Sequence, residues 1–385
     1  MKYDDVFLVL ALATRANGLH HMKREIILRQ QGSSHTTPLV VSNNCGETIY
    51  PGILTQAGTG PASTGFELTP GTNKSQTVSH DWQGRVWGRT NCTFNSQGTS
   101  MGGGKACGSG DCNGGLGCLV TGDVPVTLAE FTLDGGDGQT YFDISLVDGY
   151  NLPVAIVLVP HGNVSLDDIP PNLTSPSCIG TASQLAEATY DPYSQGQQTF
   201  LGTNSSYPLP FDQKLATSTV AQWCPWDLQV SPPKAPGDGV YPYPDDNIQR
   251  PAFNPCLSAC AKYKDPKYCC TGKYDSPKVC KPNYYSTVSK EVCPDAYSFA
   301  YDDQSSTFII PSGAGFEVVF CPGGRSTTIL KSKAAQLSEL ASSGTVSGSG
   351  GASATASSLA TPKLDAPGVC LWMAILMAAF MILFA

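Results

Sequence analysis

The chain has 385 residues, with 23 basic and 31 acidic side chains and a formal net charge of −8. Proteins that hold nucleic acid through its phosphates need a basic surface, so this charge balance argues against a nucleic-acid partner. Charged residues make up only 14% of the chain, where soluble domains carry roughly a quarter, while the hydrophobic fraction is an ordinary 41%. The composition therefore indicates a folded, secreted protein whose surface is built from uncharged polar groups.

The cysteine content points to disulfides. The chain has 15 cysteines and no Cys-x-x-Cys spacing, and of its five histidines only His80 and His161 lie beyond the first cysteine. Zinc sites normally use histidine or that spacing, so we expect no metal and no cofactor. Disulfides persist in oxidising compartments, which predicts export from the cell.

The N-terminus has features of a leader peptide. An apolar run from Val6 to Ala13 is followed by small residues at Thr14 and Ala16, which predicts a cleaved signal peptide over residues 1–16. The acidic pair Asp4-Asp5 is atypical for such a leader, and a misassigned chain start is the alternative. Residues 17–38 are interpreted as a linker.

From residue 39 to about 325 the chain alternates short β-branched or aromatic runs with Gly, Pro, Asn and Asp, which is typical of an antiparallel β protein. The strongest strand patterns are Val126–Leu133 and Thr140–Val147, separated by the turn-forming residues 134–139, so we expect a β-hairpin there. Phe316–Phe320 resembles a closing strand.

Three intervening segments carry other signals. Residues 256–293 hold six cysteines and can have little core of their own, so disulfides must hold this segment. The Pro-rich residues 231–244 predict an exposed extended loop. Sequons for N-glycosylation occur at Asn73, Asn91, Asn163, Asn172 and Asn204, of which Asn91 is the weakest because Cys92 is its middle residue.

The C-terminal region predicts a glycosylphosphatidylinositol (GPI) anchor. Residues 326–361 are interpreted as a Ser/Gly/Ala-rich linker with the attachment site, and residues 362–385 as the hydrophobic tail of the signal. A tail-anchored transmembrane helix is the alternative, although it would normally keep a basic flank and about 20 apolar residues. Removal of the tail takes Cys370 with it and leaves 14 cysteines, an even number.

Several segments together resemble the thaumatin-like proteins. The segment Gly103–Cys118 resembles the family signature, with departures at Lys105 and Ser109. Other segments match in family order, namely Trp87–Phe94, Thr127–Phe131, Tyr141–Pro153, Cys293–Phe299 and Phe320–Pro322. The resemblance runs from about residue 39 to 324 and implies a mainly β protein, an antiparallel β-sandwich with disulfide-rich loop lobes.

The resemblance also implies the disulfide pairing, which the sequence alone leaves open. The family usually has sixteen cysteines. The one that falls near Ile309–Ser312 is absent here and its partner is expected to be lost too, which leaves Cys178 to pair with Cys293. The implied bridges are Cys45–Cys321, Cys92–Cys107, Cys112–Cys118, Cys178–Cys293, Cys224–Cys256, Cys260–Cys269 and Cys270–Cys280.

The resemblance further implies an acidic cleft made by one arginine and four acids, which map onto Arg89, Glu130, Asp143, Asp148 and either Asp302 or Asp303. A hairpin that is symmetric about residues 136–137 places Glu130 opposite Asp143. Opposed carboxyls need a compensating cation or a raised pKa, and Arg89 is the candidate cation. We expect Glu130 to carry the raised pKa as the catalytic acid and Asp143 to stay ionised near Arg89. Asp148 is expected in a turn with Gly149.

Less specific interpretations of the acids and of two other patterns are the alternatives. Acids on a polar β surface often serve solubility alone. Gly98-Thr-Ser100-Met-Gly102 matches a serine-hydrolase pattern, but it lacks the strand and helix that such a nucleophile needs. Tryptophans in a β protein are more often core residues than sugar platforms, which applies to Trp82, Trp87, Trp223 and Trp226.

The sequence therefore predicts a monomeric, GPI-anchored cell-surface protein whose acidic cleft engages a neutral cell-wall polysaccharide, β-1,3-glucan. Two functions remain open. One is an endo-β-1,3-glucanase that uses Glu130 and Asp143, and the other is a non-catalytic wall-binding or defence-type protein.

Overall fold

The computed structural model describes residues 36–346, apart from 137, 160, 162–165, 167–168, 181–223, 231–254 and 323–325. The expected leader, the anchor signal, the Pro-rich loop, Trp223 and the sequons at Asn163 and Asn204 lie outside the described residues. Within the described ranges, no helix is both long and apolar enough to cross a membrane.

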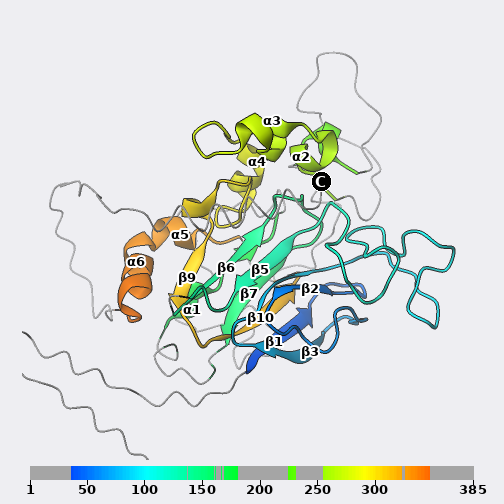
Figure 1. Ribbon diagram of the computed structural model, residues 1–385, viewed down its shortest axis with the longest axis horizontal. Coiled ribbons are helices and arrows are strands. Elements are labelled where there is room, and N and C mark those ends of the chain that lie inside the picture. The colour runs from blue at the N-terminus through cyan, green and yellow to red at the C-terminus, as the bar shows by residue number, and fades with distance from the viewer. Residues whose placement is uncertain are drawn as a thin grey trace, which may run out of the picture. The chain divides into compact units, whose positions relative to one another are not determined.

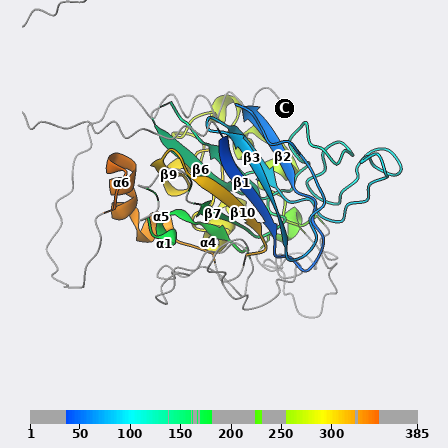
Figure 2. The same ribbon diagram turned by 90° about the horizontal axis from the view of Figure 1, so that it is seen from below.

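Two five-stranded sheets form the fold (Figures 1 and 2). The first sheet has the order β3 (Thr72–Ser79), β1 (Thr36–Asn43), β10 (Gly315–Phe320), β7 (Val154–Val159) and β8 (Ser177–Cys178). The second has the order β2 (Gly52–Ala57), β4 (Gln83–Trp87), β5 (Leu128–Thr132), β6 (Gln139–Ser145) and β9 (Phe308–Pro311). Neighbouring strands are antiparallel except for β1 and β10, which run parallel. The expected mainly β fold is confirmed.

Aromatic side chains from both sheets meet in one core. Alternation along the strands directs Phe131 of β5 and Phe142 of β6 inward, and each ring lies 5.1 Å from the ring of Phe316 in β10, measured between centroids. Trp82 and Trp87 are 1% and 0% exposed. Trp82 belongs to this core, and Trp87 to a second, smaller hydrophobic cluster with Cys112 and Cys118. Both tryptophans are packing residues, as the less specific interpretation held.

The β5–β6 hairpin has the expected register. Glu130 pairs directly with Asp143 across the two strands. The turn between them is closed by a hydrogen bond from the Gly135 amide to the Gln139 carbonyl, 2.9 Å long. Gly136 and Gly138 have φ values of +83° and +77°, a region that glycine enters without steric cost, which explains why this turn is rich in glycine.

Seven disulfides join the same cysteine pairs that the family resemblance implies. Four of them hold residues 256–293, which we name the disulfide-rich lobe. This lobe contains α2 (Ala259–Tyr263), α3 (Pro266–Cys269), the 3₁₀ turn η4 (Gly272–Tyr274) and α4 (Tyr284–Val292). Asn283 begins α4 by accepting hydrogen bonds from the amides of Tyr285 and Ser286. Short helices and crosslinks take the place of a large core here.

Residues 326–346 correct one prediction, because they continue the fold instead of forming a linker. They contain α5 (Ile329–Ser332) and α6 (Ala334–Ser343), and α6 lies beside β9 (Figure 1). Leu337 and Leu340 are 9% and 0% exposed. The Asp295 carboxylate accepts hydrogen bonds from the first amides of α5, at 2.7 and 2.9 Å. The Ser/Ala composition resembles a linker, but the leucine spacing of three residues is helical.

Substituting the buried leucine of α6 tests whether these residues belong to the domain. Leu340→Ala should lower the free energy of unfolding by about 2–5 kcal/mol, because it removes buried methyl groups and leaves a cavity. The exposed Ser338→Ala in the same helix should change stability by less than about 0.5 kcal/mol. Urea unfolding of both variants measures the difference, and equal stabilities would show that α6 does not pack on the sheet.

Candidate functional site

Three charged side chains form a row across the second sheet. Arg85 of β4 pairs with Glu130 of β5, and Glu130 pairs with Asp143 of β6, so the three lie in register on adjacent strands. Their neighbours Val86 and Phe142 are core residues. Because successive side chains of a strand point to opposite faces, the charged row lies on the face of the sheet turned away from the core.

The cation of this row is Arg85. Its Nη2 lies 3.3 Å from Oε1 of Glu130, and the two side chains are 18% and 23% exposed. Arg85 was not among the site residues predicted from the sequence. The signal that could have identified it is its position in a strand pattern directly before the core residue Val86, because adjacent residues of a strand point to opposite faces.

Arg89, which the sequence analysis placed beside Asp143, has a different role. It lies two residues beyond the end of β4 and is fully buried. Its guanidinium donates hydrogen bonds to the carbonyl oxygens of Tyr50, Gly115 and Leu116 at 2.7, 2.7 and 2.5 Å, and to a fourth carbonyl at 3.3 Å. Arg89 therefore links two loops through their carbonyl oxygens. Arg85, and not Arg89, is the cation of the charged row. Burial lowers its pKa to about 10.

Asp143 is the least exposed member of the row, at 5%. Burial raises its pKa well above the usual 3.8, the neighbouring Glu130 charge raises it further, and Arg85 partly opposes the rise. Oδ1 of Asp143 and Nε of Arg85 are buried and have no hydrogen-bond partner among the described residues. The sequence analysis expected Asp143 to be ionised and Glu130 to hold the proton, whereas the structure assigns the raised pKa to Asp143.

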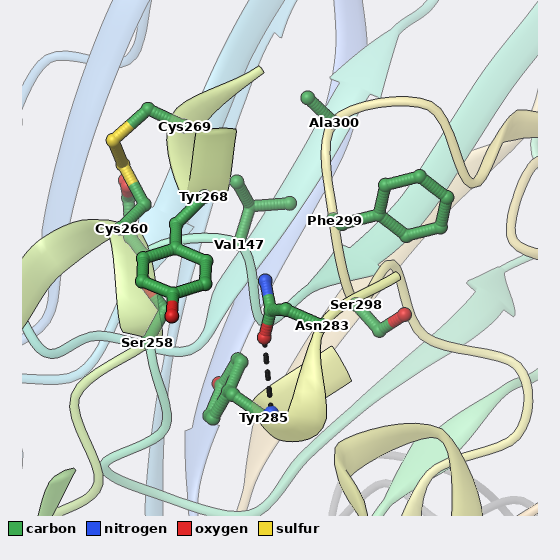
Figure 3. Close-up of a pocket in the computed structure, with 11 residues that line it drawn as sticks. Val147, Ser258, Cys260, Tyr268, Cys269, Asn283, Tyr285, Ser298, Phe299 and Ala300 are labelled. Carbon is green, nitrogen blue, oxygen red and sulfur yellow. Dashed lines mark hydrogen bonds between the residues drawn. A yellow bond between two sulfur atoms is a disulfide. The ribbon is translucent and has the colours of Figure 1, made fainter. Parts of the chain in front are cut away.

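Asp148 lies in the turn after β6, as expected. The Gly149 amide donates to the Leu146 carbonyl at 2.9 Å, and Gly149 has φ +105°. Burial raises the pKa of Asp148. Asp148 lines a cavity of about 30 Å³ between this turn and the disulfide-rich lobe, bordered by Tyr268 and Asn283 (Figure 3). A space of this size accommodates about one water and is too small for a sugar ring.

The structure separates Asp302 from Asp303. Asp302 pairs with Nζ of Lys290 at 3.0 Å and accepts hydrogen bonds from the amide and hydroxyl of Ser298. Asp303 accepts a hydrogen bond from the Tyr297 hydroxyl at 2.9 Å, and its charge contributes to the raised pKa of Asp143. Asp303 is therefore the aspartate that is electrostatically coupled to the row. Asp302 instead stabilises the loop that contains Ser298.

The acidic side chains of this site can donate and accept protons. Within the described ranges, no three His, Cys, Asp or Glu residues lie together as metal ligands would. A protonated Asp143 next to an ion-paired Glu130 provides one proton donor and one carboxylate on the same face, and the two residues sit directly opposite each other. Directly opposed residues have Cβ atoms about 4.5–5.5 Å apart.

The raised pKa of Asp143 predicts how stability depends on pH. Between the usual 3.8 and the raised value, the folded protein binds a proton that the unfolded chain has lost, so the free energy of unfolding falls as the pH rises through this interval. Asp143→Asn removes this dependence and should be more stable than the parent at neutral pH, by about 1 kcal/mol or more. The difference should shrink toward pH 4. Thermal unfolding across pH measures it, with the exposed Asp123→Asn as the matched control. Parallel pH profiles for parent and Asp143→Asn would contradict the assignment.

Comparison with known proteins places the chain in one family. The model of the thaumatin family matches residues 43–322. The chain is 36% identical over 290 residues to pathogenesis-related protein 5 of Arabidopsis thaliana, an alignment that covers 74% of this chain and 90% of that protein. It is 31% identical over 294 residues to a glucan endo-1,3-beta-glucosidase of Prunus avium, covering 76% and 93%.

A solved structure of a laminaripentaose-producing beta-1,3-glucanase in complex with laminaritetraose aligns over 75% of this chain and 99% of that one, with 11% identity and a TM-score of 0.38. Similarity at this level assigns no function. The family model, in contrast, spans the charged row, the disulfide-rich lobe and every strand except most of β1. The chain therefore belongs to the thaumatin family.

Proposed function

We propose that the protein binds β-1,3-glucan on the outer face of the second sheet, where Arg85, Glu130, Asp143, Asp148 and Asp303 are gathered. The observation that carries this proposal is the pairing of Glu130 with Asp143, in which one carboxyl is ion-paired and the other has a raised pKa. Such groups accept hydrogen bonds from sugar hydroxyls and donate them as well. A relative named as a glucan endo-1,3-beta-glucosidase supports the choice of polymer.

We further propose that the pair hydrolyses the bound glucan. Asp143 gives its proton to the glycosidic oxygen as the bond to the anomeric carbon breaks, and Glu130 attacks that carbon to form a glycosyl-enzyme. Water then releases the sugar, with Asp143 taking the proton back. In retaining glycosidases the two carboxyl groups are about 5–5.5 Å apart, which directly opposed strand residues can satisfy. The expected product keeps the anomeric configuration of the substrate.

A second candidate is a protein that binds the wall polymer without cutting it. The low exposure of Asp143, 5%, favours this candidate, because a proton donor must reach the glycosidic oxygen directly or through one water. Binding through the more exposed Arg85 and Glu130 would not need that access.

One pair of assays separates the two functions. Purified protein is incubated with a linear β-1,3-glucan and assayed for reducing sugar, and the same preparation is tested for co-sedimentation with the insoluble polymer. Sugar release together with binding supports the hydrolase, and binding alone supports the second candidate. Absence of both would contradict the proposed glucan function.

We also propose that the protein is exported and held at the cell surface by a GPI anchor. Seven disulfides support export, since they persist in oxidising compartments. A stretch of small residues before the apolar residues 368–385 supports the anchor. Phosphatidylinositol-specific phospholipase should release the protein from intact membranes. Detection of a peptide from residues 368–385 in the mature protein would contradict the anchor.

A further inference from the structure

The disulfide-rich lobe is basic within an acidic chain. It has seven lysines against two aspartates and one glutamate, a net charge of +4, whereas the whole chain has −8. Lys290 is engaged with Asp302. The other six lysines are exposed, namely Lys262, Lys264, Lys267, Lys273, Lys278 and Lys281. The lobe therefore presents positive charge to solvent next to the acidic row of the second sheet.

A cavity of about 310 Å³ lies on this lobe. Its walls combine three tyrosines, Tyr268, Tyr274 and Tyr284, with two lysines, Lys267 and Lys281. The volume is at the lower end of the range for sites that hold small ligands. Tyr268 and Asn283, which Figure 3 shows at the small cavity, also line this larger one, so the two cavities share a wall.

The aromatic walls are held in place. The Tyr284 hydroxyl donates a hydrogen bond to the Asp227 carboxylate at 2.6 Å, and the Tyr268 and Tyr284 rings meet edge to face with centroids 6.3 Å apart. Nζ of Lys273 lies 5.2 Å from the centre of the Tyr274 ring. Two disulfides, Cys260–Cys269 and Cys270–Cys280, crosslink the segments that carry these side chains. Rigid walls reduce the entropy lost when a ligand binds.

We propose that this cavity is a second saccharide site, and that it binds an acidic polysaccharide built from uronic acids. Lys267 and Lys281 pair with the carboxylates, and the faces of the tyrosine rings pack against the C–H faces of the sugars. Charge complementarity selects this ligand over a neutral glucan, which has no group for the lysines. The site is separate from the charged row of the second sheet and does not depend on the glucan proposal.

The test is binding of a galacturonic-acid decamer to the full chain, measured by titration calorimetry at low and high salt. Lys267→Ala/Lys281→Ala should weaken binding about tenfold, since each exposed ion pair contributes modestly. The control Lys262→Ala/Lys278→Ala removes the same charge from the same lobe outside the cavity, and should weaken binding less than about twofold. Binding should also weaken at high salt, because salt screens exposed charges.

The tyrosine walls are tested separately. Tyr274→Ala should weaken binding about tenfold, whereas Tyr274→Phe keeps the ring and should bind like the parent. Cooperative urea unfolding of each of these variants shows that it is folded, independently of any glucan binding.

Three outcomes would overturn the proposal. The first is no decamer binding by the parent at low salt. The second is equal weakening by the two double-lysine variants, which would reduce the effect to general charge attraction. The third is binding of phosphatidylserine vesicles through Lys267 and Lys281 without decamer binding, which would make the cavity a lipid-facing surface.

Discussion

Glu130→Gln and Asp143→Asn should each reduce the release of reducing sugar from linear β-1,3-glucan by about 10²–10⁴-fold. Glu130→Gln removes the carboxylate that attacks the anomeric carbon, and Asp143→Asn removes the group whose raised pKa lets it donate a proton. Co-sedimentation with the insoluble polymer should change little, because both amides keep the shape of the acids.

The matched control is Asp123→Asn, an identical chemical change at an exposed aspartate that pairs with Lys105 away from the row. It should release sugar at the parent's rate. NMR of the first product formed reports the anomeric configuration, and retention is expected from the direct opposition of the two acids. If the parent releases sugar and both variants release it equally fast, the pair is not the catalytic machinery.

Arg89→Ala should lower the free energy of unfolding by about 3–5 kcal/mol. The substitution leaves the partly buried carbonyl oxygens of Gly115 and Leu116 without their side-chain donor, and the Tyr50 carbonyl keeps only the longer bond from the Arg89 amide, 3.3 Å. Each such loss costs about 1–3 kcal/mol. Arg85→Ala should cost about 1 kcal/mol or less, because the Arg85–Glu130 pair is partly exposed.

For glucan binding and sugar release the order of the two effects should be reversed, with the larger loss at Arg85. Arg85→Ala should weaken co-sedimentation and sugar release, whereas any Arg89 variant that folds should retain both. Urea unfolding measures stability, and Arg89→Lys, which keeps a cation with fewer donors, provides a milder variant if Arg89→Ala is not recovered. Equal stability of the two alanine variants would contradict the structural role of Arg89.

Two features of the fold were predicted correctly, and they rested on different grounds. The β5–β6 hairpin was predictable because alternating side chains and a glycine-rich turn lie within 20 residues of each other, which determines the register of Glu130 and Asp143. The disulfide pairing followed from the family resemblance and not from spacing. The helix α6 was missed because its small residues resemble a linker, and only its packing on β9 makes Leu337 and Leu340 part of the core.

The sequence by itself determined the fold class and the hairpin that opposes Glu130 to Asp143, because periodicity and turn chemistry are local properties. The other acids of the set came from the family resemblance. The tertiary structure decided which arginine joins those acids, since β4 and β5 are separated by 40 residues and their register depends on long-range pairing. It also decided that Asp143 has the raised pKa and that Asp303 is the aspartate coupled to it. Burial and Coulomb interactions depend on distances in space, and distant segments of this chain set those distances.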